Sequence, residues 1–195
     1  MRLSIAKILS GTVFLLASGA ALAHPSHEHA SSFMAGFYHP VGGFDHLLAM
    51  LAIGLWASSL GGRALWAIPT VFVITMLAGG GLAVAGLSVP FVEQGILLSV
   101  IILGALVLFA KRLSTAVCVV IAASFALFHG VAHGMEMPLN ADGLHYALGF
   151  AVATAGLHMV GLGFGLWMAK MGTPLVTRIS GSVIATAGLL LAFSQ

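Results

Sequence analysis

The chain has 195 residues, of which 60% are hydrophobic and only 6% are charged, with a formal net charge of +2. A soluble domain carries about a quarter charged residues, so the composition excludes a water-soluble protein and predicts an integral membrane protein. The small net charge gives no indication of nucleic acid as a partner. Nine histidines accompany seven Lys and Arg and five Asp and Glu, and imidazole is the commonest metal-binding side chain.

Residues 1–23 have the features of a secretory signal peptide. Arg2 and Lys7 form a basic start, an apolar stretch follows, and residues 21–23 read Ala-Leu-Ala, an A-x-A cleavage site. The alternative is an uncleaved first helix. In either case the chain from His24 onward is delivered to the outer side of the membrane.

Residues 24–36 form a His-rich segment that we expect on the periplasmic side. It concentrates four metal-competent side chains at its start: His24, His27, Glu28 and His29. Two interpretations stay open, a polar tail and an arm that collects metal ions, because a His-rich tract is only compositional evidence.

Residues 37–195 are predicted to form an all-α domain of six transmembrane helices. The six apolar segments run over 40–60, 64–86, 92–110, 114–133, 143–169 and 174–193, each long enough to cross about 30 Å of hydrocarbon. The connections between them are short. All basic residues after the signal lie in or beside the first, third and fifth connections: Arg63, Lys111, Arg112, Lys170 and Arg178. The positive-inside rule makes that side cytoplasmic and places both mature termini in the periplasm.

The fourth segment ends in Phe128-His-Gly-Val-Ala-His-Gly-Met-Glu136. His129 and His133 are four residues apart and share one helix face, with side chains about 6 Å apart. Glu136 has nearly the same angular position as His129 if the helix continues. This spacing suits one divalent cation, whereas the structural alternative is a polar helix end that faces water.

A second motif, His39-Pro-Val-Gly-Gly-Phe-Asp45-His46, opens the first segment. Pro40 fits a first helical position, and Gly42 and Gly43 permit a break or a close backbone contact. A kinked entrance would fold His39 back towards Asp45 and His46, which we expect to ligate metal. Asp45 has an alternative role as a helix N-cap.

Further candidates lie on the third and fifth segments. Glu93 begins the third from the outer side, and Asp142 and His145 open the fifth, where Asp142 has the same N-cap alternative. Four segments thus bring metal-competent residues to one level of the membrane. His158 lies near the middle of the fifth segment, where it is a second ion site, a proton carrier, or a neutral ring bonded to a Ser or Thr of another helix.

Together with the signal and the six segments, the two complete motifs resemble the HupE/UreJ family of secondary nickel permeases. The resemblance covers essentially the whole chain. It implies import of Ni²⁺ or Co²⁺ for maturation of hydrogenase or urease, with the metal as cargo and no prosthetic group. The glycine runs lack the Lys-Ser/Thr of a nucleotide-binding loop, so no nucleotide partner is expected.

The leading hypothesis is therefore a non-enzymatic permease in the bacterial inner membrane. Its primary ligands are His39, Asp45, His46, His129, His133 and Glu136. The alternatives are a membrane-embedded zinc hydrolase, with Glu136 as general base, and a metal sensor or subunit that transports nothing alone. Besides metal and lipid, the sequence leaves a homo-oligomer open.

Overall fold

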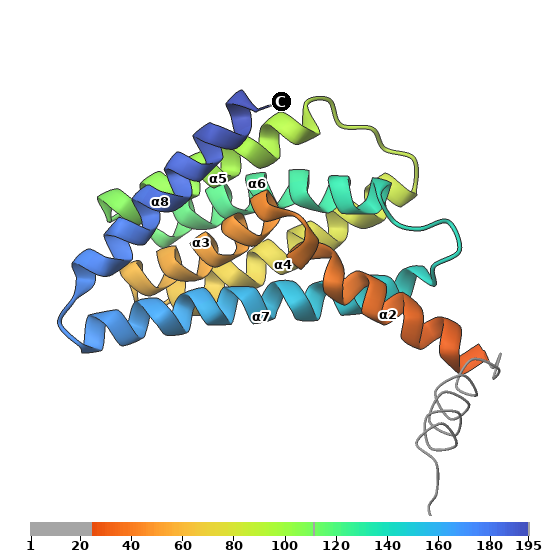
Figure 1. Cartoon of the computed structure of the whole chain (residues 1–195), viewed down its shortest axis with the longest axis horizontal. Helices are drawn as coiled ribbons and strands as arrows, with labels where there is room; N and C mark the ends of the chain where they lie inside the picture. The colour runs from red at the N-terminus through yellow and green to blue at the C-terminus, as the bar shows by residue number, and fades with distance from the viewer. Residues whose placement is uncertain (1–24, 111, 195) are drawn as a thin grey trace, which may run out of the picture.

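The computed structural model describes residues 25–110 and 112–194, and all of its regular structure over these ranges is helical. The signal-peptide prediction, His24 and Lys111 lie outside the described residues. Within the described ranges the helices are α2 (Pro25–Gly42), α3 (Phe44–Leu60), α4 (Ala64–Val84), α5 (Val92–Phe109), α6 (Thr115–Met135), α7 (Gly143–Lys170) and α8 (Pro174–Phe193) (Figure 1).

The last five helices are each long and apolar enough to cross a membrane, and the pair Ala30–Gly42 and Phe44–Leu60 meets the same criteria together, as a broken span or a re-entrant loop with a bend of 84°. The predicted all-α membrane bundle is confirmed. The first span differs from the prediction, because the helix begins well before residue 40 and breaks at Gly43. Pro40 lies inside α2 near its end, so the prediction of a first helical position for it was wrong. The break at the glycines was predicted correctly.

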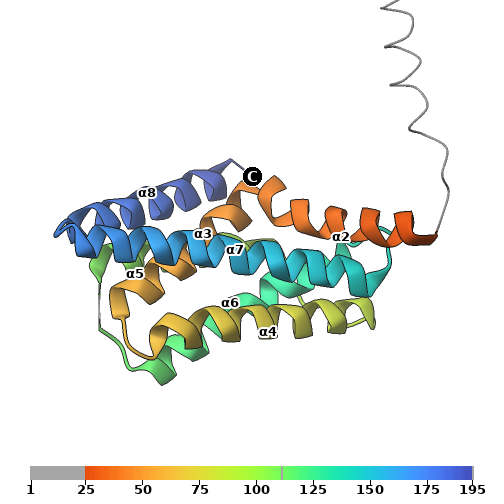
Figure 2. The same cartoon turned by 90° about the horizontal axis from the view of Figure 1, so that it is seen from below.

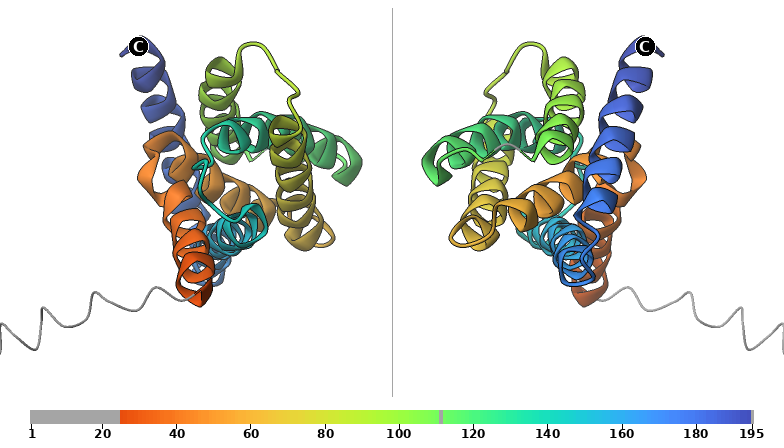
Figure 3. Two further views of the ribbon diagram at one scale, coloured as in Figure 1. Left: turned by 90° about the vertical axis from the view of Figure 1, so that its right-hand side faces the viewer. Right: turned by 90° about the vertical axis from the view of Figure 1, so that its left-hand side faces the viewer.

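The central helix of the bundle is α3, which is buried on almost every side from Ala49 to Ala57. In the end-on views it runs through the middle of the bundle (Figure 3). A helix that is apolar around its whole circumference belongs in a core. Outward-facing apolar side chains such as Trp66, Val120 and Leu190 are about two-thirds exposed, as expected of surfaces that face lipid.

Small residues let the helices approach closely. In α6, a Cβ on Gly130 would collide with the carbonyl of Met76 in α4, and these two helices lie side by side (Figure 2). Close backbone contact through small residues is a common way for membrane helices to pack. This contact holds the α6 segment that carries His129 and His133 firmly against α4.

The bundle has two ends with different chemistry. The loops 85–91 and 136–142 lie at one end and the α7–α8 turn lies at the other, while the α2–α3 break lies between the two ends (Figure 1). The described basic residues Arg63, Arg112, Lys170 and Arg178 are all beside the turns of this second end. Every histidine cluster described below is nearer the first end.

Candidate metal site

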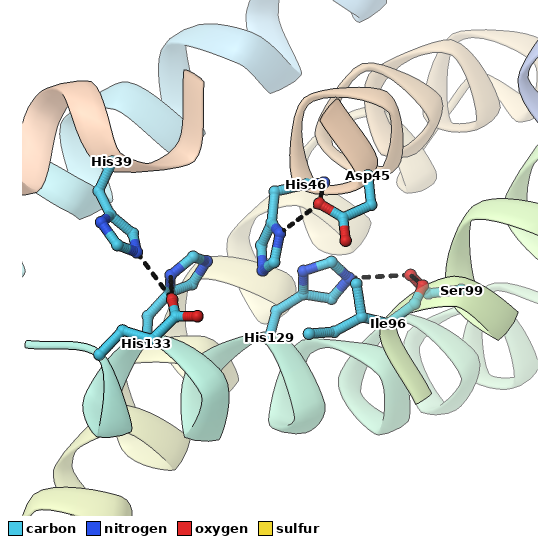
Figure 4. A network of polar contacts seen from close by, with 8 residues as sticks. His39, Asp45, His46, Ile96, Ser99, His129 and His133 are labelled. Atoms are coloured by element: carbon cyan, nitrogen blue, oxygen red, sulfur yellow. Dashed lines mark hydrogen bonds and ion pairs between the residues drawn. The ribbon is translucent and has the colours of Figure 1, made fainter. Parts of the chain in front are cut away.

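The break at Gly43 brings two helix ends onto α6. Gly43 has extended backbone (φ −95°, ψ 117°) and caps α3, so the chain turns sharply between His39 and His46. Both rings then contact His133, with ring centroids 4.7 Å from it for His39 and 4.2 Å for His46 (Figure 4). The kinked entrance predicted from the sequence is therefore present.

Two overlapping groups of possible metal ligands result. The buried group consists of His46, His129 and His133. The more exposed group, called the outer group below, consists of His39, His133 and Glu136. Within each group one ligand atom per residue lies within 4.8 Å of the others. His133 belongs to both groups, so an ion could pass from one to the other without losing every protein ligand.

The hydrogen bonds of His46 determine which of its nitrogens is free. Asp45 Oδ1 accepts from the backbone N–H of His46 at 2.7 Å and from its Nδ1 at 2.8 Å. A carboxylate only accepts, so Nδ1 carries the proton and Nε2 presents a lone pair. Nε2 is buried and has no hydrogen-bond partner within the described chain. Asp45 thus orients a ligand, as an outer-shell carboxylate does in other metal sites.

A serine plays the same part for His129. Ser99 Oγ donates to the carbonyl of Ile96 at 2.6 Å and lies 2.8 Å from His129 Nε2 (Figure 4). With the hydroxyl proton directed at the Ile96 carbonyl, the serine oxygen accepts from Nε2–H of His129. The lone pair of His129 is therefore on Nδ1, which is also buried and unpartnered among residues 25–110 and 112–194. The buried group thus holds two imidazoles whose neutral tautomers are set for ligation.

Glu136 connects the outer group. It caps the end of α6, and its Oε2 lies 2.9 Å from His39 Nε2 and 3.5 Å from His133 Nδ1. The imidazole of His133 first, and that of His39 second, lower the pKa of Glu136 to about 2 against the opposing effect of partial burial. The carboxylate is half-exposed and ionised at any physiological pH.

A cavity of about 590 Å³ leads to these groups. Its lining includes five of the six predicted primary ligands and the secondary candidate Glu93: His39, Asp45, His46, Glu93, His133 and Glu136. Glu93, in the first turn of α5, adds a second carboxylate to the entrance. Because Glu93 lies at the start of α5 and Glu136 at the end of α6, the cavity reaches the end of the bundle that carries loops 85–91 and 136–142, and cations would enter from there.

The remaining sequence-predicted candidates lie apart from this cavity. Asp142 caps α7, and its Oδ1 accepts from the backbone N–H of His145 and lies 2.9 Å from its ring Nδ1, so its N-cap alternative is confirmed. His158 is buried near the middle of α7 and does not line this cavity. The backbones of His27, Glu28 and His29 belong to the first turns of α2, and metal capture by them stays a prediction.

Sequence reasoning missed Ser99. It is an isolated polar residue within an apolar span, which was the available signal, but only the folded bundle places it against His129. A Ser or Thr bond was considered for His158 instead. That interpretation was wrong within the described chain, since neither ring nitrogen of His158 has a hydrogen-bond partner there.

Comparison with known proteins gives two matches. The family model described as HupE / UreJ protein matches residues 12–191. A relative named Protein HupE, from Rhizobium leguminosarum bv. viciae, is 42% identical over 178 residues, which cover 88% of this chain and 93% of the relative. No solved structure matches.

Proposed function

The chain belongs to the HupE/UreJ family of permeases, and from that premise we propose that it imports Ni²⁺ or Co²⁺ through the two ligand groups that share His133. The observation that carries the proposal is the pair of oriented lone pairs on His46 and His129. Asp45 and Ser99 hold the proton on the other nitrogen of each ring.

Burial strengthens this argument. A buried polar atom without a hydrogen bond costs about 1–3 kcal/mol, and such atoms in native proteins call for an explanation. The buried group gathers several of them: His46 Nε2, His129 Nδ1 and His133 Nε2. A divalent cation would satisfy them together, and a borderline ion such as Ni²⁺ or Co²⁺ suits imidazole ligands.

The outer group would act first. Glu93 and Glu136 attract a hydrated cation into the cavity, because clefts lined by one sign of charge concentrate counter-ions. His39, His133 and Glu136 replace part of its water shell. His133 then keeps hold of the ion while His46 and His129 replace His39 and Glu136. Stepwise exchange keeps each state incompletely coordinated, and this favours release.

The direction of transport follows from charge. Basic residues gather at the end of the bundle opposite the cavity, and that end is cytoplasmic by the positive-inside rule. The cavity then opens to the periplasm of a bacterium, where both mature termini also lie. The imported metal would serve hydrogenase or urease maturation, as the resemblance to nickel permeases implies.

The zinc-hydrolase alternative is disfavoured by Glu136. A general base works best with a pKa near the operating pH, whereas the pKa of Glu136 is lowered to about 2. Its carboxylate is also engaged by His39. The sensor or subunit alternative is separated from a permease by measuring transport.

The test is uptake of radioactive Ni²⁺ by proteoliposomes that contain the purified chain, with Co²⁺ and Zn²⁺ as competitors. We expect saturable uptake that His133→Ala abolishes. His145→Ala is the matched control, since it removes an imidazole that lies outside both ligand groups. Tight binding without movement across the bilayer would refute the permease and leave a sensor or subunit.

A further inference from the structure

His158 is a buried imidazole that belongs to neither ligand group. It lies in the middle of α7 with 1% of its surface exposed, and neither ring nitrogen has a hydrogen-bond partner in the described ranges. A membrane interior offers no water to solvate such a ring. An intramembrane ionisable residue in this condition indicates a functional position.

The surroundings of His158 supply further donor atoms. Thr154 lies one turn away on the same face of α7 and is fully buried. Its Oγ1 lies 3.8 Å from Sδ of Met76 in α4. Phe72 lies one turn before Met76 in α4. Its ring is perpendicular to that of His158, with the two ring centroids 5.2 Å apart. The two helices thus present an imidazole, a hydroxyl and a thioether to one region of the core.

Phe72 also links this region to the ligand groups above it. Its ring centroid lies 5.6 Å from that of His129 and 5.2 Å from that of His158. One fully buried phenyl ring therefore lies in contact with both imidazoles.

A cavity leads onward from His158. It has a volume of about 490 Å³, lies between α4 and α7, and extends to Leu65 in the first turn of α4. Its lining also includes the exposed side chains of Trp66 and Ile74, so it is open on the outer face of these two helices. Pro69 lines the same cavity, and because proline has no N–H, the carbonyl of Leu65 lacks its helical donor.

We propose that His158 is an inner ligand station for the divalent cation, which reaches it from His129 past the ring of Phe72. This inference rests on the proposed function. With one imidazole and two weaker donors, the station holds the ion less tightly than the three-histidine group does. Weak binding at this point favours release to the cytoplasm, and an imidazole with a thioether suits Ni²⁺ or Co²⁺ better than Mg²⁺.

The experiment compares Ni²⁺ binding with Ni²⁺ transport. His158→Ala and His158→Gln are purified, their thermal stability is checked, and binding is measured by equilibrium dialysis and uptake in proteoliposomes. Thr177→Val, which removes a buried hydroxyl from α8, is the matched control. We expect both His158 variants to bind Ni²⁺ within about threefold of the parent while maximal uptake falls at least tenfold. His133→Ala should lose Ni²⁺ binding itself, so a defect in the two ligand groups that share His133 is distinguished from a defect at His158.

Three results would overturn the inference. Uptake by folded His158 variants at the parental rate would remove His158 from the path. Loss of both Ni²⁺ binding and Ni²⁺ uptake would place His158 in the same binding site as His133. Normal downhill Ni²⁺ uptake that no longer responds to a pH gradient would make it a proton carrier instead.

Discussion

Substitution of Ser99 by alanine tests whether its hydrogen bond to His129 supports metal binding. Ser99 and His129 are both fully buried, and the serine oxygen is the only described hydrogen-bond acceptor for His129 Nε2–H. Its removal allows the proton to move to Nδ1, the nitrogen that we assign to the metal. The ring also loses the contact that fixes its orientation.

The expected size of the effect comes from two independent estimates. A lost outer-shell partner of a ligating histidine typically lowers metal affinity about 10–100-fold, which corresponds to about 1.4–2.7 kcal/mol. Leaving a buried N–H unpaired costs about 1–3 kcal/mol. The two ranges agree, and we therefore expect Ni²⁺ affinity to fall between one and two orders of magnitude.

The assay is equilibrium dialysis of the purified variant against Ni²⁺, with uptake measured in parallel. Ser124→Ala is the matched control, because Ser124 is an exposed serine on α6 whose hydroxyl donates to the carbonyl of Val120 in the same helix. If Ser99→Ala folds normally and binds Ni²⁺ within twofold of the parent, the assignment of the His129 tautomer is refuted.

Three further predictions concern the orienting carboxylate, the pH profile and helix packing. Asp45→Asn should lower Ni²⁺ affinity about 10–100-fold in the same dialysis assay, because an amide no longer compels His46 to carry its proton on Nδ1; unchanged affinity would contradict this. Uptake should decline from about pH 7.5 to about pH 5.5, since a protonated imidazole cannot ligate. Glu136, with its pKa lowered to about 2, stays ionised throughout this range. Glu136→Gln should therefore weaken binding without moving the midpoint of the pH profile, and a shifted midpoint would assign the titration to Glu136. Its stabilising effect on the fold is present above its ordinary pKa of about 4.5 and is lost only as the pH falls towards 2. Gly130→Ala should destabilise the bundle by about 1–3 kcal/mol, because its Cβ would collide with a carbonyl of α4. Thermal unfolding checks this against Gly81→Ala, where a Cβ meets nothing within 4 Å.

The helices and the identity of most candidate ligands could be predicted from the sequence. Hydropathy is a local property, so segment positions were found to within a few residues, except where α2 extends the first span backwards. The spacing of His129 and His133 determined their shared face, since an α-helix repeats every 3.6 residues. The break at the glycines before Asp45 was also visible, because such residues interrupt a helix locally.

Only the tertiary structure decided which of these residues meet. The same compositional argument applied to His39 and to His145. The 84° bend brings the ring of His39 into contact with His133, whereas the backbone N–H of His145 donates to Asp142, the N-cap of α7. The free nitrogens of His46 and His129 depend on Asp45 and Ser99, and Ser99 lies thirty residues from its partner. Phe72 between His129 and His158 has no sequence signature at all. The kind of metal ligand that a side chain offers follows from its residue type and its spacing along a helix. The tautomer of each imidazole, its depth in the bundle and its place along the proposed ion path arise from contacts between helices.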